Sequence, residues 1–381
     1  MWWGKEFFVN LAKKALTKIV ILVTSDIIAD QRIHRTASTL IKQGFSVTVV
    51  GRRLKTTPKI VEKEYNTVLF RLPFNKGPAF YACYNLWVFI YLLFHRYNLI
   101  HANDLDTLLA ARITSRLLNK SIVYDSHELF TEVPELVDRP RTRNFWYRLE
   151  KRLTKGLQHC STVSNGVSQE LKERYGMNCT IIRNLPFRKP YPEKKPRQDE
   201  KTIIYQGALN IGRGLKKLID AMVLLPNYKL IIVGSGPIHK ELKQKTETLK
   251  ITERVILYGK VEHEHLHRIT CIAQLGVSIE EDMGLNYRYA LPNKIFDYIQ
   301  AGIPVLASNL PEMAKIVNTY EIGTTIDPDC NSHQLAAAIE SMLTDTDAMH
   351  AWHQNTERAA DELCWETEQD KLLSLIQKAL L

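Results

Sequence analysis

The sequence lacks the cysteine patterns that mark zinc sites and disulfide frameworks. Its 381 residues include six cysteines at widely separated positions, with no CxxC pair. This argues against a structural zinc site and a disulfide-stapled fold, and it favours reduced thiols in a cytosolic protein. The composition, 45% apolar and 24% charged without low-complexity tracts, is that of a globular protein. A chain of this length exceeds one compact core, so we expect two domains.

Long hydrophobic runs are also absent. No run of about 18 uncharged apolar residues is present, so we expect no transmembrane helix. The nearest candidate, residues 79–94, is either a largely buried helix or a helix that dips into a membrane interface. The N-terminal residues lack a signal-peptide pattern. They predict a basic amphipathic helix over 1–17, which suits either a membrane surface or simple packing.

Charge is distributed unevenly along the chain. Residues 1–190 hold 30 Lys and Arg against 15 Asp and Glu, whereas the remainder holds 21 against 26. The basic first half indicates an anionic partner, such as a nucleic acid, a phosphorylated substrate or an acidic membrane surface.

Strand and helix patterns alternate along both halves. In the first half, apolar strand-like runs at 18–24, 45–51, 98–104 and 121–128 are separated by helical patterns. The alternation restarts near residue 202 and continues to about 327, and from about Trp352 only helix is expected. This predicts an α/β protein with two Rossmann-like, doubly wound parallel sheets. Ligands are then expected at the carboxyl ends of the strands, where polar residues cluster.

A proline-rich, charged stretch over 184–201 marks the best domain boundary. We therefore predict an N-terminal domain over 1–185, a linker over 186–201 and a C-terminal domain over 202–350. Residues 351–381 are expected to form terminal helices.

The stretch YQGALNIGRGLKKLIDA (205–221) places a glycine loop between a strand and a helix. Such a loop offers free backbone N–H groups and a helix N-terminus to an anion. Arg213 adds a fork of donors suited to a diphosphate. Gly207 and Gly214 alone are equally well explained by a structural tight turn. The VGSGP stretch (233–237) is interpreted as structural.

The stretch ALPNKIFDYIQAGIPVLAS (290–308) predicts a loop, a helix and a strand. Pro292 suits the first helical turn, and Asn293 and Lys294 follow at the helix start. A lysine at this end opposes the helix dipole, and a bound anion would remove the conflict. The alternative is an exposed ion pair between Lys294 and Asp297.

Further carboxylates and a histidine follow predicted strands. Glu280, Glu281 and Asp282 end one strand and are plausible partners of ligand hydroxyls, whereas metal-ligand spacing is absent. His127 lies beside Asp125 and can donate a hydrogen bond or move a proton near neutral pH, or it can be structural. The HEHLH tract (263–267) is interpreted as a helix start.

Taken together, these stretches resemble the family 4 glycosyltransferases (glycosyl transferases group 1) of the GT-B fold, over roughly residues 18–375. The most specific part is LPNKIFDYIQAGIPVLAS with the following PE and IGTTIDP; the 205–221 loop and LEKRLTKGLQHCSTVSNGVSQEL (149–171) add to it. The resemblance implies two Rossmann-like domains that face a cleft, with the last helix crossing back to the first domain.

The resemblance also implies roles for individual residues. Arg213 takes the place of a lysine that contacts the donor diphosphate, and Asp297 that of a glutamate that binds the ribose hydroxyls. His127 matches a histidine near the sugar and the reacting bond. The donor-binding candidates are Gly207, Arg213, Gly214, Glu280, Pro292, Asn293, Lys294 and Asp297, and the catalytic candidates are His127 and Glu281.

The sequence departs from the family pattern at several positions. Tyr289 stands where the first glutamate of the E-x7-E motif is expected, so that carboxylate comes from Glu280, Glu281 or Asp282. Ala208 stands where many members have an arginine, and Lys294 is our candidate for its role. The glycine-rich loop after the first strand is replaced by SDIIADQRIHR. The acceptor-side candidates are Asp30, Arg32, His34 and Asp104.

The resemblance implies a retaining, metal-independent glycosyltransferase that uses a nucleotide-diphosphate-sugar and no further cofactor. With the basic first half, it predicts a glycan or lipid-linked acceptor at an anionic membrane, on its cytoplasmic face, and no nucleic acid. The alternatives are a GT-B sugar-nucleotide epimerase and a non-catalytic nucleotide-sugar-binding scaffold.

Overall fold

The computed structural model describes residues 17–381 except 26, 29, 56, 58–62, 134, 135, 137 and 191–200. The predicted N-terminal helix and most of the predicted linker therefore lie outside the described residues. The chain divides into two compact units. Unit 1 comprises 1–184 and 368–381, and unit 2 comprises 185–367.

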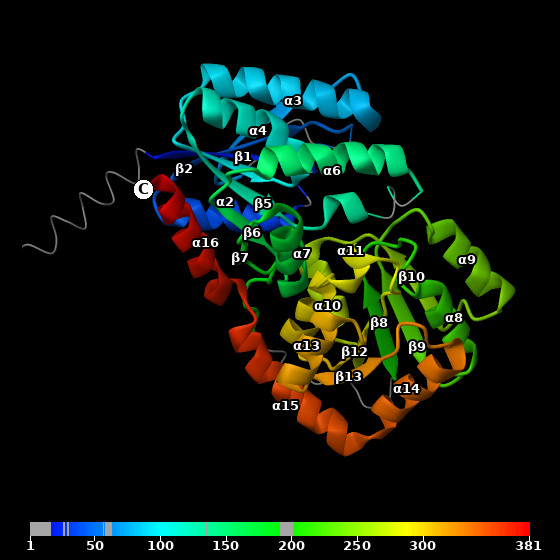
Figure 1. Ribbon diagram of the computed structural model, residues 1–381. Coiled ribbons are helices and arrows are strands. Elements are labelled where there is room, and N and C mark those ends of the chain that lie inside the picture. Colours follow the sequence, from blue (N-terminus) through cyan, green and yellow to red (C-terminus); the bar gives the residue numbers. More distant parts are fainter. Residues whose placement is uncertain are drawn as a thin grey trace, which may run out of the picture. The chain divides into compact units, whose positions relative to one another are not determined.

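Unit 1 is built on a seven-stranded parallel sheet in the order β3-β2-β1-β4-β5-β6-β7 (Figure 1). Its strands are β1 Lys18–Leu22, β2 Ser46–Arg52, β3 Asn66–Phe70, β4 Leu99–Asn103, β5 Ser121–Ser126, β6 Cys160–Thr162 and β7 Thr180–Ile181. Its helices are α2 Gln31–Lys42, α3 Gly77–Phe94, α4 Leu105–Leu117, η1 Phe130–Glu132, α6 Pro140–Thr154 and α7 Asn165–Tyr175.

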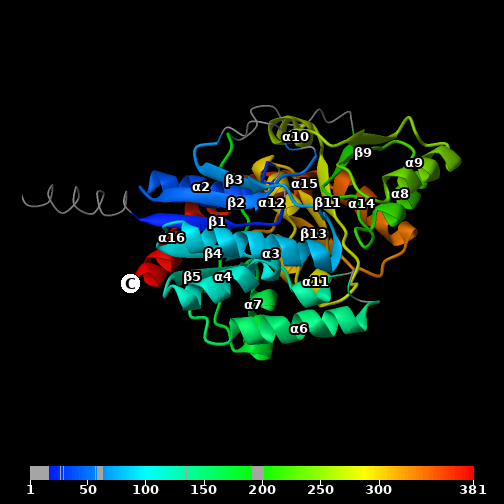
Figure 2. The same cartoon turned by 90° about the horizontal axis from the view of Figure 1, so that it is seen from above.

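The strand order places the helices of unit 1 on both faces of the sheet. The connections through α3, α4 and α6 run in one direction across the sheet, and the connection through α2 runs in the other. Because such crossovers are right-handed, α3, α4 and α6 share one face and α2 lies on the opposite one (Figures 1 and 2). Strands β1 and β4 are almost wholly buried between these layers.

Helix α3 corrects one sequence interpretation. Residues 79–94 do form a helix, and of the two alternatives the largely buried helix is not met, since only 28% of residues 77–94 are buried. By length and composition it is, among the described helices, the one that could cross a membrane. It is nevertheless the crossover between β3 and β4, and its inner residues Tyr84, Val88 and Leu92 are fully buried. The sequence did not show which side of this helix faces outward, because both sides are apolar.

Unit 2 is built on a six-stranded parallel sheet in the order β10-β9-β8-β11-β12-β13. Its strands are β8 Thr202–Gln206, β9 Lys229–Val233, β10 Val255–Gly259, β11 Leu275–Ser278, β12 Val305–Ser308 and β13 Gly323–Ile326. Its helices are α8 Leu215–Val223, α9 His239–Thr248, α10 His263–Thr270, α11 Leu285–Arg288, α12 Asn293–Gln300, α13 Pro311–Tyr320, α14 Ser332–Thr344 and α15 Thr346–Glu362.

Two hydrophobic cores sandwich the second sheet. One joins the strands to α8, α9 and α14, and the other joins them to α12, α13 and α15. The final helix, α16 Trp365–Leu380, begins in unit 2 and continues into unit 1. Within unit 1, Gln369 of α16 lies 3.4 Å from the Thr39 hydroxyl of α2. The expected doubly wound α/β fold is thus confirmed in both halves.

Candidate functional site

The first polar cluster lies at the carboxyl edge of the unit 2 sheet and is framed by a glycine loop. Strand β8 leads into Gly207, and the loop ends at Gly214, the N-cap of α8. Gly214 has a φ of +67°, and a Cβ there would lie 2.2 Å from the Ile279 carbonyl oxygen. Only glycine therefore allows this loop to approach the end of β11 so closely. The nearby Gly234 packs against the Gly207 backbone in the same way, which gives the VGSGP stretch a structural role.

Glu280 is the centre of this cluster. Its side chain is fully buried and accepts hydrogen bonds from Lys294 Nζ at 2.7 Å and Arg213 Nη1 at 3.2 Å. Ser278 Oγ donates to its other oxygen at 2.7 Å, and Ser308 Oγ donates to its backbone carbonyl. One carboxylate from the end of β11 thus joins the α8 loop to the start of α12.

The charges of this cluster are strongly coupled. Burial by itself raises the pKa of the Glu280 carboxyl, but Lys294 and Arg213 outweigh it and hold that pKa below its usual value. Each cation also lies against an aromatic ring: Lys294 Nζ is 4.0 Å from the Tyr205 ring centroid, and the Arg213 guanidinium carbon is 5.2 Å from that of Tyr287. Arg213, Lys294 and Glu280 taken together therefore carry one net positive charge.

Lys294 and Asp297 have different partners, although they lie three residues apart. Lys294 is only 7% exposed and pairs with Glu280, which removes the conflict between its charge and the N-terminus of α12. The half-buried Asp297 accepts a hydrogen bond from Gln206 Nε2 at 2.8 Å. Gln206 is itself held by the Thr270 hydroxyl at 2.7 Å. The surface ion-pair interpretation therefore does not describe this helix. Pro292 is its N-cap, and Asn293 is its exposed first residue.

The three adjacent acids separate into three environments. Glu280 is buried between the cations, and Asp282 pairs with Arg288 at 2.8 Å on the surface. The half-buried Glu281 is fixed by its backbone, whose N–H donates to the Gly212 carbonyl at 2.9 Å. Its carboxylate forms no hydrogen bond within the described part of the chain. It is thus the one of the three that is left available to a ligand.

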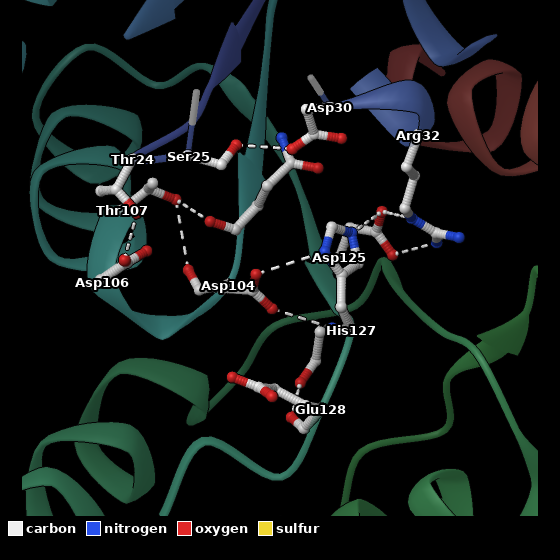
Figure 3. Close-up of polar contacts among 12 residues, drawn as sticks. Thr24, Ser25, Asp30, Arg32, Asp104, Asp106, Thr107, Asp125, His127 and Glu128 are labelled. Atoms are coloured by element: carbon white, nitrogen blue, oxygen red, sulfur yellow. Dashed lines mark hydrogen bonds and ion pairs between the residues drawn. The ribbon is translucent and has the colours of Figure 1, made fainter. Parts of the chain in front are cut away.

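A second polar cluster lies at the carboxyl edge of the unit 1 sheet (Figure 3). Asp125, at the end of β5, is clamped by Arg32 of α2 in a bidentate pair with Nη2–Oδ1 2.7 Å and Nε–Oδ2 2.9 Å. Ser161 Oγ also donates to Asp125 at 2.8 Å. Burial raises the pKa of Asp125, but the positive charges of Arg32 and His127 hold it well below its ordinary value.

His127 lies between two carboxylates in this cluster. Its Nε2 is 2.9 Å from Asp125 Oδ2, and its Nδ1 is 3.2 Å from Asp104 Oδ2. Both ring nitrogens face acceptors, so both carry protons in this arrangement. Burial alone lowers the pKa of His127, but the two carboxylates raise it to about 10. In this state the imidazolium is a fixed positive charge rather than a proton shuttle at neutral pH.

The predicted acceptor-side residues lie in several environments. Arg32 and Asp104 belong to the cluster just described, whereas Asp30 is the N-cap of α2 and accepts from Ile33 N at 3.1 Å. The ring of His34 lies beside Tyr65, at 6.1 Å between centroids. No hydrogen bond joins the His34 side chain to the Asp104–His127 cluster among the described residues.

Several members of these clusters were not among the predicted site residues. The sequence marks Asp125 only as a neighbour of His127, and it gives Gln206 no predicted role. Asp106, in the first turn of α4, accepts a hydrogen bond from Thr24, while its other oxygen is buried without a partner among the described residues. Burial, with repulsion from Asp104, raises its pKa to about 7. The sequence signal for all three was their place at or just after a strand end.

Comparison with solved structures defines the class of the protein. The sucrose-phosphate synthase of Thermosynechococcus elongatus superposes with a TM-score of 0.80 at 18% identity, over 95% of this chain and 98% of that one. Anabaena HepE, solved in complex with UDP-glucose, gives 0.71 at 18% identity, over 94% and 99%. Two parallel-sheet α/β units with these neighbours define a GT-B fold.

Family models and a curated relative narrow the class to a family. Residues 29–185 match Glycosyltransferase Family 4, and residues 187–359 match Glycosyl transferases group 1. A chitobiosyldiphosphodolichol beta-mannosyltransferase of Yarrowia lipolytica is 30% identical over 135 residues, which span 34% of this chain and 28% of the relative. The two models together span residues 29–359, so the chain belongs to the glycosyltransferases that they describe.

Proposed function

We propose that the protein transfers a sugar, with retention and without a metal, from a nucleotide-diphosphate-sugar to a hydroxyl of a lipid-linked glycan. The observation that carries the proposal is the convergence of Lys294 and Arg213 on buried Glu280. The two cations lie beside the N-termini of α12 and α8 at the carboxyl edge of the sheet. Phosphate groups are bound at such places in α/β proteins.

In the proposed reaction, the bond between the anomeric carbon and the diphosphate oxygen breaks. Its electron pair leaves with the diphosphate, the acceptor oxygen bonds to the carbon, and the proton of the acceptor hydroxyl passes to the departing diphosphate oxygen. Negative charge therefore grows on the diphosphate, and Arg213, Lys294 and the loop N–H group at Gly214 stabilise it. The Gly207 N–H already donates to the Val233 carbonyl at 2.9 Å, so Gly207 contributes only the shape of the loop. Fixed donors in a partly desolvated site are effective because they do not reorganise during the reaction.

The remaining residues of unit 2 take supporting roles in this proposal. Asp297, oriented by Gln206, accepts hydrogen bonds from the ribose hydroxyls, which is consistent with its half-buried position. Pro292 and Asn293 form the loop that faces the donor sugar. Glu281 presents the unpaired carboxylate and is our candidate for contact with the reacting sugar.

The unit 1 cluster is proposed to serve the acceptor side. Asp104 is part-exposed and fixed by His127, so it can accept a hydrogen bond from an acceptor hydroxyl. Arg32 and Asp125 position His127, whose charge is suited to interact with oxygen atoms near the transferred sugar. The yeast relative's name specifies a dolichol-linked substrate, which supports a lipid-linked acceptor here. We propose that the reaction takes place at the cytoplasmic face of a membrane.

The alternatives raised by the sequence are not favoured. The matched family models and the named relatives are glycosyltransferases, which supports neither an epimerase nor a non-catalytic scaffold. The disrupted E-x7-E motif had suggested a scaffold, but the adjoining site retains a buried carboxylate and two cations.

A thermal-shift screen with UDP-, GDP-, dTDP- and ADP-sugars tests the donor site. A bound donor raises the melting temperature, since it binds only the folded state. We expect one base to give a clear shift that Arg213→Ala removes. Lys216→Ala is the matched control, because Lys216 lies in the first turn of the same helix but pairs with the exposed Glu241. An unchanged donor shift in Arg213→Ala would overturn the site.

A further inference from the structure

The outer surface of unit 1 carries a feature that sugar transfer does not use. Helices α3, α4 and α6 lie side by side on one face of the sheet (Figures 1 and 2). Asn85 of α3 donates to the Asp106 carbonyl of α4 at 2.8 Å, and Tyr81 of α3 meets Trp146 of α6 with 5.0 Å between ring centroids. We call the exposed side of this layer the α3–α4–α6 face.

Helix α3 contributes the apolar part of this face. Its residues 77–94 contain no charged side chain. Its outer residues recur at spacings of three and four and are exposed by 58% at Leu86, 48% at Trp87, 39% at Ile90 and 81% at Phe94. A helix that is apolar all round is normally enclosed, yet these four side chains remain exposed in unit 1, even though Phe70 stacks on part of Trp87.

The neighbouring helices add apolar side chains and a positive rim. Ile113 and Leu117 of α4 and Phe145 of α6 are exposed. Five cations on these two helices are also exposed: Arg116, Arg141, Arg148, Lys151 and Arg152. The three helices contain only two acids, Asp106 and Glu150, and both are buried. The exposed side of this layer therefore combines apolar groups with charge of a single sign.

The apolar and positively charged side chains of this face together favour one kind of binding partner. A second copy of the chain would bring each cationic rim against its own equivalent, and like charges disfavour such an interface. A nucleic acid would satisfy the arginines but not the apolar α3 side chains. An anionic lipid surface satisfies both, because headgroup phosphates pair with arginine while Trp, Phe, Leu and Ile enter the boundary with the acyl chains.

We propose that the α3–α4–α6 face docks the protein on an anionic bilayer, with α3 lying in the interface. The inference deepens the proposed function, since a docked enzyme meets a lipid-linked acceptor in two dimensions. In this inference, α3 and its flanking arginines form the surface that contacts the bilayer. Helix α3 keeps its place as a crossover in the sheet and does not span the membrane.

Vesicle flotation of the full chain tests the docking. We expect binding to phosphatidylcholine vesicles that contain phosphatidylglycerol, weak binding to phosphatidylcholine alone, and a loss of binding at high salt. Trp87→Gln/Phe94→Gln should abolish flotation, because both side chains leave water on docking. Arg141→Gln/Arg148→Gln/Arg152→Gln should weaken it by roughly tenfold to a hundredfold and reduce its salt dependence.

Matched variants in unit 2 distinguish binding through the α3–α4–α6 face from non-specific adsorption to the vesicles. Tyr258→Gln/Ile272→Gln removes two exposed apolar side chains there, and Lys240→Gln/Lys243→Gln/Lys250→Gln removes three exposed cations. Both should float like the wild type. The melting temperature without vesicles checks that each variant is folded, which is expected because the changed side chains are exposed.

Two results would overturn the inference. One is undiminished flotation of the folded Trp87→Gln/Phe94→Gln variant. The other is a lipid-free dimer that this variant dissociates, which would make the face a contact between copies. The donor-induced thermal shift, measured on the same variants, should be unchanged. If the wild type floats with vesicles but shows no donor-induced thermal shift, the proposed function is contradicted and the docking inference is retained.

Discussion

The two units hold opposite charge arrangements at equivalent places. In unit 2, two cations, Lys294 and Arg213, grip one buried carboxylate at the carboxyl edge of the sheet. In unit 1, two carboxylates, Asp104 and Asp125, grip one imidazolium at the corresponding edge. Arg32 also pairs with Asp125, so the charges of the unit 1 cluster balance, although residues 1–190 carry an excess of Lys and Arg and the remainder an excess of Asp and Glu.

The comparison teaches that net charge and site charge serve different purposes. A cationic edge in an otherwise acidic unit provides a place for a diphosphate. A carboxylate-rich edge in a basic unit suits hydroxyl groups, which donate hydrogen bonds to carboxylates. Part of the excess of Lys and Arg in the first half lies away from this cluster, on the α3–α4–α6 face. The predictions below test the two clusters against each other.

The largest effect is expected from Glu280→Gln in unit 2. The change leaves Lys294 and Arg213 without their shared counter-ion in a buried position, so unit 2 should lose about 3–5 kcal/mol of stability. Denaturant unfolding measures this loss. Asp282→Asn is the control, because it breaks only the exposed pair with Arg288. Equal stabilities for the two variants would show that Glu280 does not hold the cluster together.

Asp125→Asn tests the opposite arrangement in unit 1. It removes the negative charge that Arg32 and His127 share, so both cations lose a counter-ion. We expect the free energy of unfolding to fall by about 2–3 kcal/mol. The same unfolding experiment reports it. Sugar transfer should fall as well, while the donor-induced thermal shift stays intact, because the proposed donor residues lie in unit 2. A lost donor shift would contradict the division of roles.

The pH dependence of stability distinguishes the two clusters further. The pKa of His127 is raised to about 10, so the folded state holds a proton that the unfolded state releases near its ordinary pKa of 6.5. The resulting stability is fully present below about pH 6.5 and declines as the pH rises toward 10. His127→Gln should remove most of this decline between pH 7 and pH 10. A decline that persists unchanged in the variant would assign it to another group.

The smallest effect is expected from Asp30→Ala. Asp30 caps α2 through Ile33 N, and the loss of such a cap costs about 1 kcal/mol. If Asp30 is only a cap, transfer by the folded variant should not change, and Asp30→Ser should restore the stability. A large fall in transfer with little loss of stability would support the acceptor role predicted from the sequence.

Much of the fold could be predicted from local patterns, because the hydrophobic periodicity identifies each strand and the helix that follows it. The glycine loop before α8 and the start of α12 were located correctly for the same reason. The orientation of α3 could not be predicted, since its inner and outer residues are equally apolar. Only the topology, which places α3 against α4, decides which side is exposed.

The pairing of charges was the part that sequence spacing could not supply. Lys294 and Asp297 are separated like a helix pair, but Lys294 bonds to Glu280, fourteen residues earlier on a neighbouring strand end. The sequence likewise could not show which of the three adjacent acids is buried, because this depends on which side chain the backbone at the end of β11 directs into the protein. Asp30, by contrast, was predictable as a cap from its position just before the helical pattern.

The central claim is that Arg213 and Lys294 hold the two phosphates of the donor. Its most direct test compares the affinities of the preferred nucleoside diphosphate and the matching monophosphate by titration calorimetry. The wild type should prefer the diphosphate by about a hundredfold, and Arg213→Ala should lose most of that preference while monophosphate binding changes little. An equal preference in the wild type and Arg213→Ala would contradict the account.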